Sequence, residues 1–195
     1  MKPDYTKFLD QNLEQTEIDW SANPRVHETQ EQALNQLLAS IEDSDPTILE
    51  VGCGTGIFAG LVQGFKYTGV DQSEKGLELA RKRSPEKTFI QGDVRSMELP
   101  KADIVCSFAV LKHFGLHEWD QRLAQILAAA SKWAIFTQPI ADQDRDGVEP
   151  GYEEPSFPHV WVTMDRLEAV LKFCGFKIKH INKDDVEWTF EVERC

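Results

Sequence analysis

Cysteine is scarce in this 195-residue chain, and its four copies stand far apart, at Cys53, Cys106, Cys174 and Cys195. No CxxC pair occurs, so neither a zinc knuckle nor a redox dithiol is indicated. The first three lie in apolar or glycine-rich surroundings, which is typical of small buried side chains rather than of disulfide partners. We therefore expect a reducing, cytoplasmic location.

Long apolar runs and an excess of positive charge are missing too. No stretch approaches the roughly 20 apolar residues that span a bilayer, and the mixed, acidic N-terminal segment is unlike a signal peptide. The formal net charge is -12, from 33 acidic and 21 basic residues. Because this excess repels phosphate backbones, we expect neither nucleic acid nor a membrane as a partner.

Apolar segments of strand length alternate with helical segments over residues 46–138. Strands are expected at 47–51, 65–71, 87–93, 102–110 and 132–140, and helices at 57–64, 73–84 and 117–131. This alternation is typical of a doubly wound parallel sheet with helices on both faces. The strands are apolar throughout, as strands buried on both faces are.

The remaining segments complete what we expect to be a single domain over residues 1–195. Residues 1–45 are amphipathic and predict a helical cap or lid. Residues 139–163 are acidic and rich in Pro and Gly, which predicts a functional or mobile loop. Residues 164–195 predict a helix followed by an antiparallel hairpin.

Three polar features follow three successive strands. Gly52, Gly54 and Gly56 form a GxGxG turn after the first strand, and Asp71 and Asp93 end the next two. Because the carboxyl ends of parallel strands line one crevice, these features should meet in space. A carboxylate about 20 residues after the first glycine suits the two ribose hydroxyls of an adenosine. A helix cap is the other interpretation of Asp71.

The glycine pattern departs from the two common phosphate-binding motifs. The dinucleotide fingerprint needs a small residue at position 57, where this chain has Ile57, and no GK[ST] follows to make a P-loop. No HExxH occurs either, so we expect no metal. An NAD-linked oxidoreductase stays open as an alternative, although no YxxxK dyad is present.

The four stretches "ILEVGCGTG", "YTGVDQSEKGLELARKR", "FIQGDVRSMEL" and "ADIVCSFAVLKHF" together resemble the motifs of class I S-adenosylmethionine-dependent methyltransferases. The resemblance implies a three-layer αβα Rossmann-like sandwich. Its sheet would have seven mostly parallel strands, with an antiparallel last strand. It also implies S-adenosylmethionine as the cofactor, with S-adenosylhomocysteine as the product.

The resemblance also implies a set of cofactor-binding residues. Asp71 would bind the ribose hydroxyls, Asp93 the adenine amine, and Phe108 would face the sulfonium. The full set is Glu50, Gly52, Cys53, Gly54, Gly56, Asp71, Gln72, Gly92, Asp93, Val94 and Phe108. Arg25 could pair with the cofactor's carboxylate, although an exposed arginine is an equal interpretation.

His113 and His159 are the two candidate general bases. His113 follows the fourth strand, where acceptors bind in the family, and its alternative is a helix cap. His159 lies in the 139–163 segment, and its alternative is a packed loop residue. The motifs of DNA and protein-arginine methylases are missing, so the expected acceptor is a small molecule methylated on oxygen or nitrogen. A non-catalytic protein that binds the cofactor is the other alternative.

Overall fold

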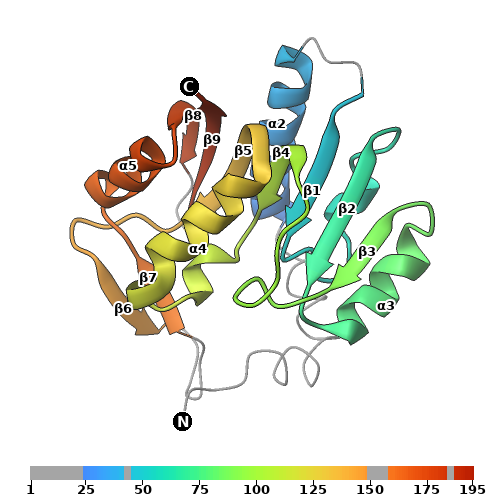
Figure 1. Cartoon of the computed structure of the whole chain (residues 1–195), viewed down its shortest axis with the longest axis horizontal. Helices are drawn as coiled ribbons and strands as arrows, with labels where there is room; N and C mark the ends of the chain where they lie inside the picture. The colour runs from blue at the N-terminus through green and yellow to red at the C-terminus, as the bar shows by residue number, and fades with distance from the viewer. Residues whose placement is uncertain (1–23, 42–44, 149–157, 184–186) are drawn as a thin grey trace.

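The computed structural model describes residues 24–41, 45–148, 158–183 and 187–195 (Figure 1). The predicted N-terminal cap up to residue 23 lies outside these ranges. Its last part is present as helix α2, Pro24–Ser40. This helix carries the predicted apolar stripe, and Ala33, Leu34 and Leu37 are buried against the sheet.

A seven-stranded sheet in the order β3-β2-β1-β4-β5-β9-β8 forms the centre of the molecule. The strands β1 to β5 are parallel wherever they pair. Strand β9 runs antiparallel to both of its neighbours, which confirms the predicted Rossmann-like topology. The strands are β1 (Thr47–Val51), β2 (Lys66–Asp71), β3 (Thr88–Gln91), β4 (Ala102–Ser107), β5 (Ala130–Gln138), β8 (Phe176–Lys183) and β9 (Trp188–Arg194).

Helices cover both faces of this sheet and make the three-layer sandwich. In Figure 1, helix α4 lies in front of the sheet and α2 lies behind it. One apolar cluster contains α4 (Leu116–Ala129) and α5 (Met164–Phe173), and the other contains α2, the short 3-10 helix η1 (Phe58–Gly60) and α3 (Glu74–Arg83). Alternate residues of each strand enter opposite clusters, so Ile48 packs toward α2 and Leu49 toward α4.

Helices α3 and α5 begin shortly after strands end, and the sequence supplies an N-cap residue for each of them. Ser73 follows β2, and its hydroxyl accepts a hydrogen bond from the backbone N–H of Gly76 at 3.1 Å. Thr163 caps α5 in the same way, accepting from Arg166 N at 3.3 Å. These caps satisfy N–H groups that the first turn of a helix leaves free. They fix how each chain segment leaves the sheet edge.

Two predicted elements are wrong. The helix expected over 57–64 is only the 3-10 turn η1, closed by an i to i+3 hydrogen bond from Leu61 N to Phe58 O. The segment 139–163, expected as a loop, contains a second, two-stranded sheet. It pairs β6 (Arg145–Val148) with β7 (Pro158–Trp161). The Pro, Gly and acidic residues of this segment argued against strands, because these residue types are depleted in strands.

Candidate functional site

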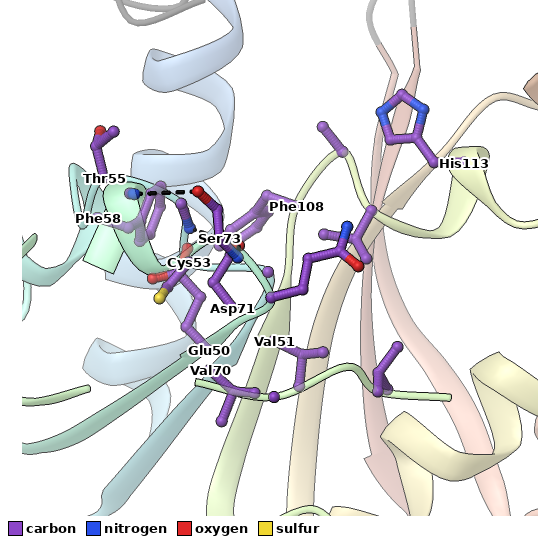
Figure 2. Close-up of a pocket in the computed structure, with 18 of the residues that line it drawn as sticks. Glu50, Val51, Cys53, Thr55, Phe58, Val70, Asp71, Ser73, Phe108 and His113 are labelled. Atoms are coloured by element: carbon purple, nitrogen blue, oxygen red, sulfur yellow. Dashed lines mark hydrogen bonds between the residues drawn. The ribbon is translucent and has the colours of Figure 1, made fainter. Parts of the chain in front are cut away.

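A cavity opens at the carboxyl ends of β1, β2, β3 and β4, where the loops after these strands converge (Figure 2). Most of the predicted cofactor residues line it, together with one of the two predicted bases. They are Glu50, Gly52, Cys53, Gly54, Asp71, Gln72, Gly92, Asp93, Val94, Phe108 and His113. Gly56 and His159 are not among the lining residues. The side chain of Arg25 lies outside the described part of the chain.

The glycine turn after β1 is a tight backbone loop fastened to β2. The N–H groups of Gly52 and Cys53 donate to the carbonyl of Val70 at 2.7 and 3.1 Å. Gly52 and Gly56 have φ of 80° and 71°, a region in which side chains are strained. A Cβ at residue 56 would also lie 2.7 Å from the Cβ of Ala80 in α3. Gly56 therefore serves helix packing rather than the cavity, which explains why the cofactor role predicted for it finds no wall position.

Asp71 joins the glycine turn to the loop after β2. Its Oδ2 accepts from the N–H of Gly54 at 2.8 Å, and its Oδ1 accepts from the N–H of Ser73 at 2.9 Å. The side chain is 7% exposed. Asp71 also lines the cavity, and a carboxylate has about four acceptor positions, more than these two N–H groups use. The turn-forming and the ligand-facing interpretations of Asp71 are thus compatible.

The wall after β3 carries the second strand-end carboxylate. Asp93 Oδ1 accepts from the N–H of Arg95 at 2.8 Å. The Asp93 side chain is 40% exposed, so it lies at the rim of the cavity. Arg95 also lines the cavity, lies 4.7 Å from the ring centre of Phe114, and donates to Glu118 at 3.2 Å. This end of the cavity is polar and open.

Glu50 forms the floor of the cavity under the glycine turn and is only 5% exposed. The hydroxyl of Tyr67 donates a short hydrogen bond to its Oε2. Burial raises the pKa of Glu50 to about 7, the Tyr67 hydrogen bond opposes this rise, and the charge of Asp71 adds to it. Glu50 can therefore hold or release a proton near neutral pH.

The end of β4 supplies an aromatic wall. The rings of Phe58 and Phe108 are 4.5 Å apart, and both residues line the cavity. Ala109 follows with φ of 55°, the only non-glycine with positive φ among the described residues. Its N–H donates to the Thr137 hydroxyl on β5 at 2.7 Å. Such strain is characteristic of functional loops, and no residue pattern around Ala109 predicts it.

The two predicted bases lie side by side, but only one reaches the cavity. His113 ends the 3-10 helix η2 (Leu111–His113) and lines the cavity on the side opposite the glycine turn (Figure 2). His159 on β7 stacks on His113, with ring centres 5.6 Å apart, and is 3% exposed. Burial, helped by the charge of Lys112, lowers the pKa of His159 to about 4. His159 is therefore a neutral ring behind His113.

Several lining residues were not predicted, and Gln30 on α2 is the most informative of them. The other unpredicted wall residues are Val51, Thr55, Ile57, Phe58, Val70, Ser73, Gly76, Arg95, Ala109, Val110 and Phe114. Most of them directly neighbour a predicted residue, so the strand-end rule could have found them. Gln30 could not be found that way, since it comes from a helix distant in sequence.

The described ranges contain neither a metal-binding cluster nor a membrane-spanning helix. No group of three or more His, Cys, Asp or Glu side chains in these ranges is arranged to hold a metal ion. Within the same ranges, no helix combines the length and the apolar character that crossing a membrane requires.

Part of this chain matches a known protein family. The family described as "Methyltransferase domain" matches residues 48–132. A malonyl-[acyl-carrier protein] O-methyltransferase of Priestia megaterium is 32% identical over 114 residues. That alignment covers 54% of this chain and 42% of the relative, so the chain matches less than half of the relative's length.

Solved structures share the fold over nearly the whole chain. The magnesium protoporphyrin IX methyltransferase of Synechocystis PCC 6803, solved with bound S-adenosylmethionine, has a TM-score of 0.74 at 18% identity. It covers 99% of this chain and 98% of its own. The 1,6-didemethyltoxoflavin-N1-methyltransferase of Burkholderia thailandensis has a TM-score of 0.74 at 16% identity, covering 97% and 86%. The matched domain, the sheet order and the glycine turn agree: residues 48–132 match a methyltransferase domain, and the described chain has the fold of the S-adenosylmethionine-dependent methyltransferases compared above.

Proposed function

We propose that this protein transfers a methyl group from S-adenosylmethionine to an oxygen or nitrogen of a small-molecule acceptor and releases S-adenosylhomocysteine. The observation that carries the proposal is the cavity itself. In it, a glycine turn without the dinucleotide or P-loop motif, a buried carboxylate at Asp71 and a rim carboxylate at Asp93 lie at neighbouring strand ends. This arrangement suits a nucleoside with an amino-acid tail.

The cofactor would lie across the strand ends with its ribose at Asp71. Asp71 would accept from the two ribose hydroxyls, and Asp93 and the Val94 N–H would face the adenine next to Gln72 and Gly92. The amino-acid tail would lie over Gly52, Cys53, Gly54 and Glu50. Phe108 would then face the sulfonium, whose positive charge an aromatic ring tolerates well.

Methyl transfer is a single displacement. A lone pair of the acceptor forms a bond to the methyl carbon while the carbon–sulfur bond breaks, and its electron pair goes to sulfur, which becomes a neutral thioether. The protein's main task is alignment and the exclusion of water. If the acceptor arrives protonated, its proton must leave to a base. His113 is the base that we propose, because it lines the cavity, whereas His159 supports it from behind.

The names of two related proteins support both attacking atoms. The malonyl-[acyl-carrier protein] relative is an O-methyltransferase, and the toxoflavin relative is an N1-methyltransferase. The cavity of this chain offers aromatic walls and one imidazole at its acceptor side, which suits a planar or apolar acceptor with one polar atom.

Two broader expectations belong to the same proposal. We propose that the described elements act as one domain, because both apolar clusters are built on the same sheet. We also propose a cytoplasmic location. It is supported by the state of Cys53 and Cys106, which are free and buried rather than joined in disulfides.

Calorimetry with S-adenosylhomocysteine tests the donor half of the proposal. Asp71→Ala should weaken binding by roughly 2–4 kcal/mol, because two hydrogen bonds between a charged group and the ribose are lost. Asp142→Ala is the matched control, because Asp142 is exposed and lies away from the cavity. Heat from NAD but none from S-adenosylhomocysteine would overturn the proposal.

Turnover against phenols, amines and carboxylates tests the acceptor half. Release of S-adenosylhomocysteine with one class identifies the attacking atom. A protein that binds the cofactor tightly but turns over none of the panel would instead be the non-catalytic alternative.

A further inference from the structure

Gln30 is a buried polar side chain that the proposed cofactor assignment leaves unused. It lies on α2, lines the cavity, and is 2% exposed. Its amide nitrogen, Nε2, has no hydrogen-bond partner among the described residues. A buried donor without a partner destabilises the fold. Such a group needs an acceptor, and the cavity is the space that it faces.

The position of Gln30 on the helix makes this polar residue unusual. Ala33, Leu34 and Leu37 follow it at helical spacing, and all three are buried in the apolar cluster below α2. Gln30 continues this stripe, where a leucine would pack against the same surface. The stripe thus changes from apolar to polar at the turn of α2 that borders the cavity.

The surroundings of Gln30 define what kind of partner fits. Across the cavity wall, Glu50 already accepts the Tyr67 hydroxyl, and the rings of Phe58 and Phe108 have no strong acceptor. Among the lining residues that the structure describes, Arg95 is the only lysine or arginine, and it belongs to the rim after β3. At the glycine-turn end of the cavity, the hydrogen-bond donor that α2 supplies is therefore the neutral amide of Gln30. A ligand oxygen that carries negative charge satisfies this amide best.

We propose that Gln30 Nε2 donates a hydrogen bond to the carboxylate of the cofactor's amino-acid tail. The inference rests on the proposed function and adds a specificity-determining residue to it. Helix α2 thereby becomes a wall of the donor site, and Gln30 distinguishes the full cofactor from nucleosides that lack the amino-acid tail. The role that the sequence suggested for Arg25 would fall to Gln30, a different residue of the same helix.

Two ligands that differ only in this tail provide the test. Gln30→Met keeps the length of the side chain and removes the donor. Its affinity for S-adenosylhomocysteine should fall about 10- to 100-fold, which corresponds to one hydrogen bond to a charged group. Its affinity for 5′-methylthioadenosine, which has no carboxylate, should stay the same. Gln36→Met is the matched control, because Gln36 is exposed on the same helix.

The outcomes separate the inference from the proposed function. Unchanged affinity of Gln30→Met for S-adenosylhomocysteine would overturn the inference, and so would an equal loss for both ligands, since the latter indicates a distorted cavity. A wild-type protein that binds neither ligand would overturn the proposed function itself. If Gln30→Met unfolds at lower temperature than the wild type, Gln30→Ala repeats the two-ligand comparison with the smaller side chain.

Discussion

At the scale of single residues, the carboxyl group of Glu50 is held near its point of ionisation. Burial raises its pKa to about 7, the hydrogen bond from Tyr67 lowers it, and the Asp71 charge raises it. The folded pKa thus lies above the ordinary value of 4.5. The stability that the protonated group contributes is complete below about pH 4.5. It is lost as the pH rises through about 7.

Glu50→Gln should therefore become more stable than the wild type as the pH rises. The amide cannot ionise, so the difference in unfolding free energy should change by roughly 1.4 kcal/mol per pH unit across this window. Urea unfolding of both proteins at pH 5, 6, 7 and 8 measures this difference. His159, whose lowered pKa gives the opposite slope as the pH falls below 6.5, is present in both proteins and cancels. A difference that is constant with pH would contradict the prediction.

Gly54 and Gly56 have the same backbone handedness but different surroundings. Their φ values are 50° and 71°, so alanine at either position is strained by about 1–2 kcal/mol. A Cβ at residue 54 meets nothing within 4 Å, whereas one at residue 56 lies 3.1 Å from the Cα of Ala80. Gly56→Ala should lose a further 1–3 kcal/mol, roughly, because α3 must move. Urea unfolding should rank the variants, and equal losses would contradict this account.

Single residues of the site differed in how well the sequence could predict them. Asp71 and Asp93 were predictable because they end strands, and strand ends share one edge of a parallel sheet. Gln30 was not predictable, because a polar residue that continues a helical apolar stripe gives no sign in the sequence that it is buried or that it lines a cavity. His159 was predicted as a base for its position in the sequence, but β7 directs it behind His113.

At the scale of elements, one arginine connects the β6–β7 hairpin to two helices. Arg166, in the first turn of α5, donates to Asp120 on α4 at 2.7 Å and to Asp144, just before β6, at 3.1 Å. It also donates to the carbonyl of Leu116 at 3.1 Å. Because β7 carries His159, this arginine helps to fix the acceptor side of the cavity.

Arg166→Ala should lower the free energy of unfolding by roughly 1–2 kcal/mol. Three hydrogen bonds are lost, but the partners are partly exposed, so each contributes less than it would if buried. Denaturation with urea measures the loss. Glu168→Ala is the control, since Glu168 is an exposed residue of the same helix. If both variants unfolded alike, the arginine would contribute nothing measurable.

The hairpin also shows where prediction of elements failed. Strands β1 to β5 are apolar runs bounded by turn residues, and strands of this kind can be predicted from the sequence. Strands β6 and β7 contain Gly147 and Pro158. In the fold, β7 packs on η2, and Asp146 of β6 accepts a hydrogen bond at 2.7 Å from the N–H of Leu116, the first residue of α4. Contacts between distant segments cannot be predicted from the local sequence, so neither could these two strands.

At the scale of the whole molecule, the cavity lies where the two apolar clusters meet at the sheet edge. Phe58 and Phe108 belong to the cluster under α2, whereas Val51, Val94 and Phe114 belong to the cluster under α4. A ligand in the cavity therefore contacts both layers at once. Ligand binding should stabilise the whole fold and not one face of it.

Saturation with S-adenosylhomocysteine should raise the unfolding free energy by about 2.7 kcal/mol at 100 times its dissociation constant. The unfolded chain has no such cavity, so the ligand binds the native state alone. Thermal unfolding followed by circular dichroism measures the shift, with NAD at equal concentration as the control. Stabilisation by NAD but not by S-adenosylhomocysteine would contradict the assignment.

The doubly wound parallel sheet was predictable at this scale because strand–helix alternation permits few topologies. The antiparallel direction of the last strand was predicted only through the family resemblance.

The place of β9 in the sheet affects folding during synthesis. Strand β9 comes after β8 in the chain, yet it lies between β5 and β8 in the sheet. During translation, β1 to β5 can assemble once Gln138 has left the ribosome. The outer edge of β5 has no strand to pair with until β9 emerges. A nascent chain paused between β8 and β9 exposes that bare edge to other chains. This interval is when the newly made protein most needs a chaperone.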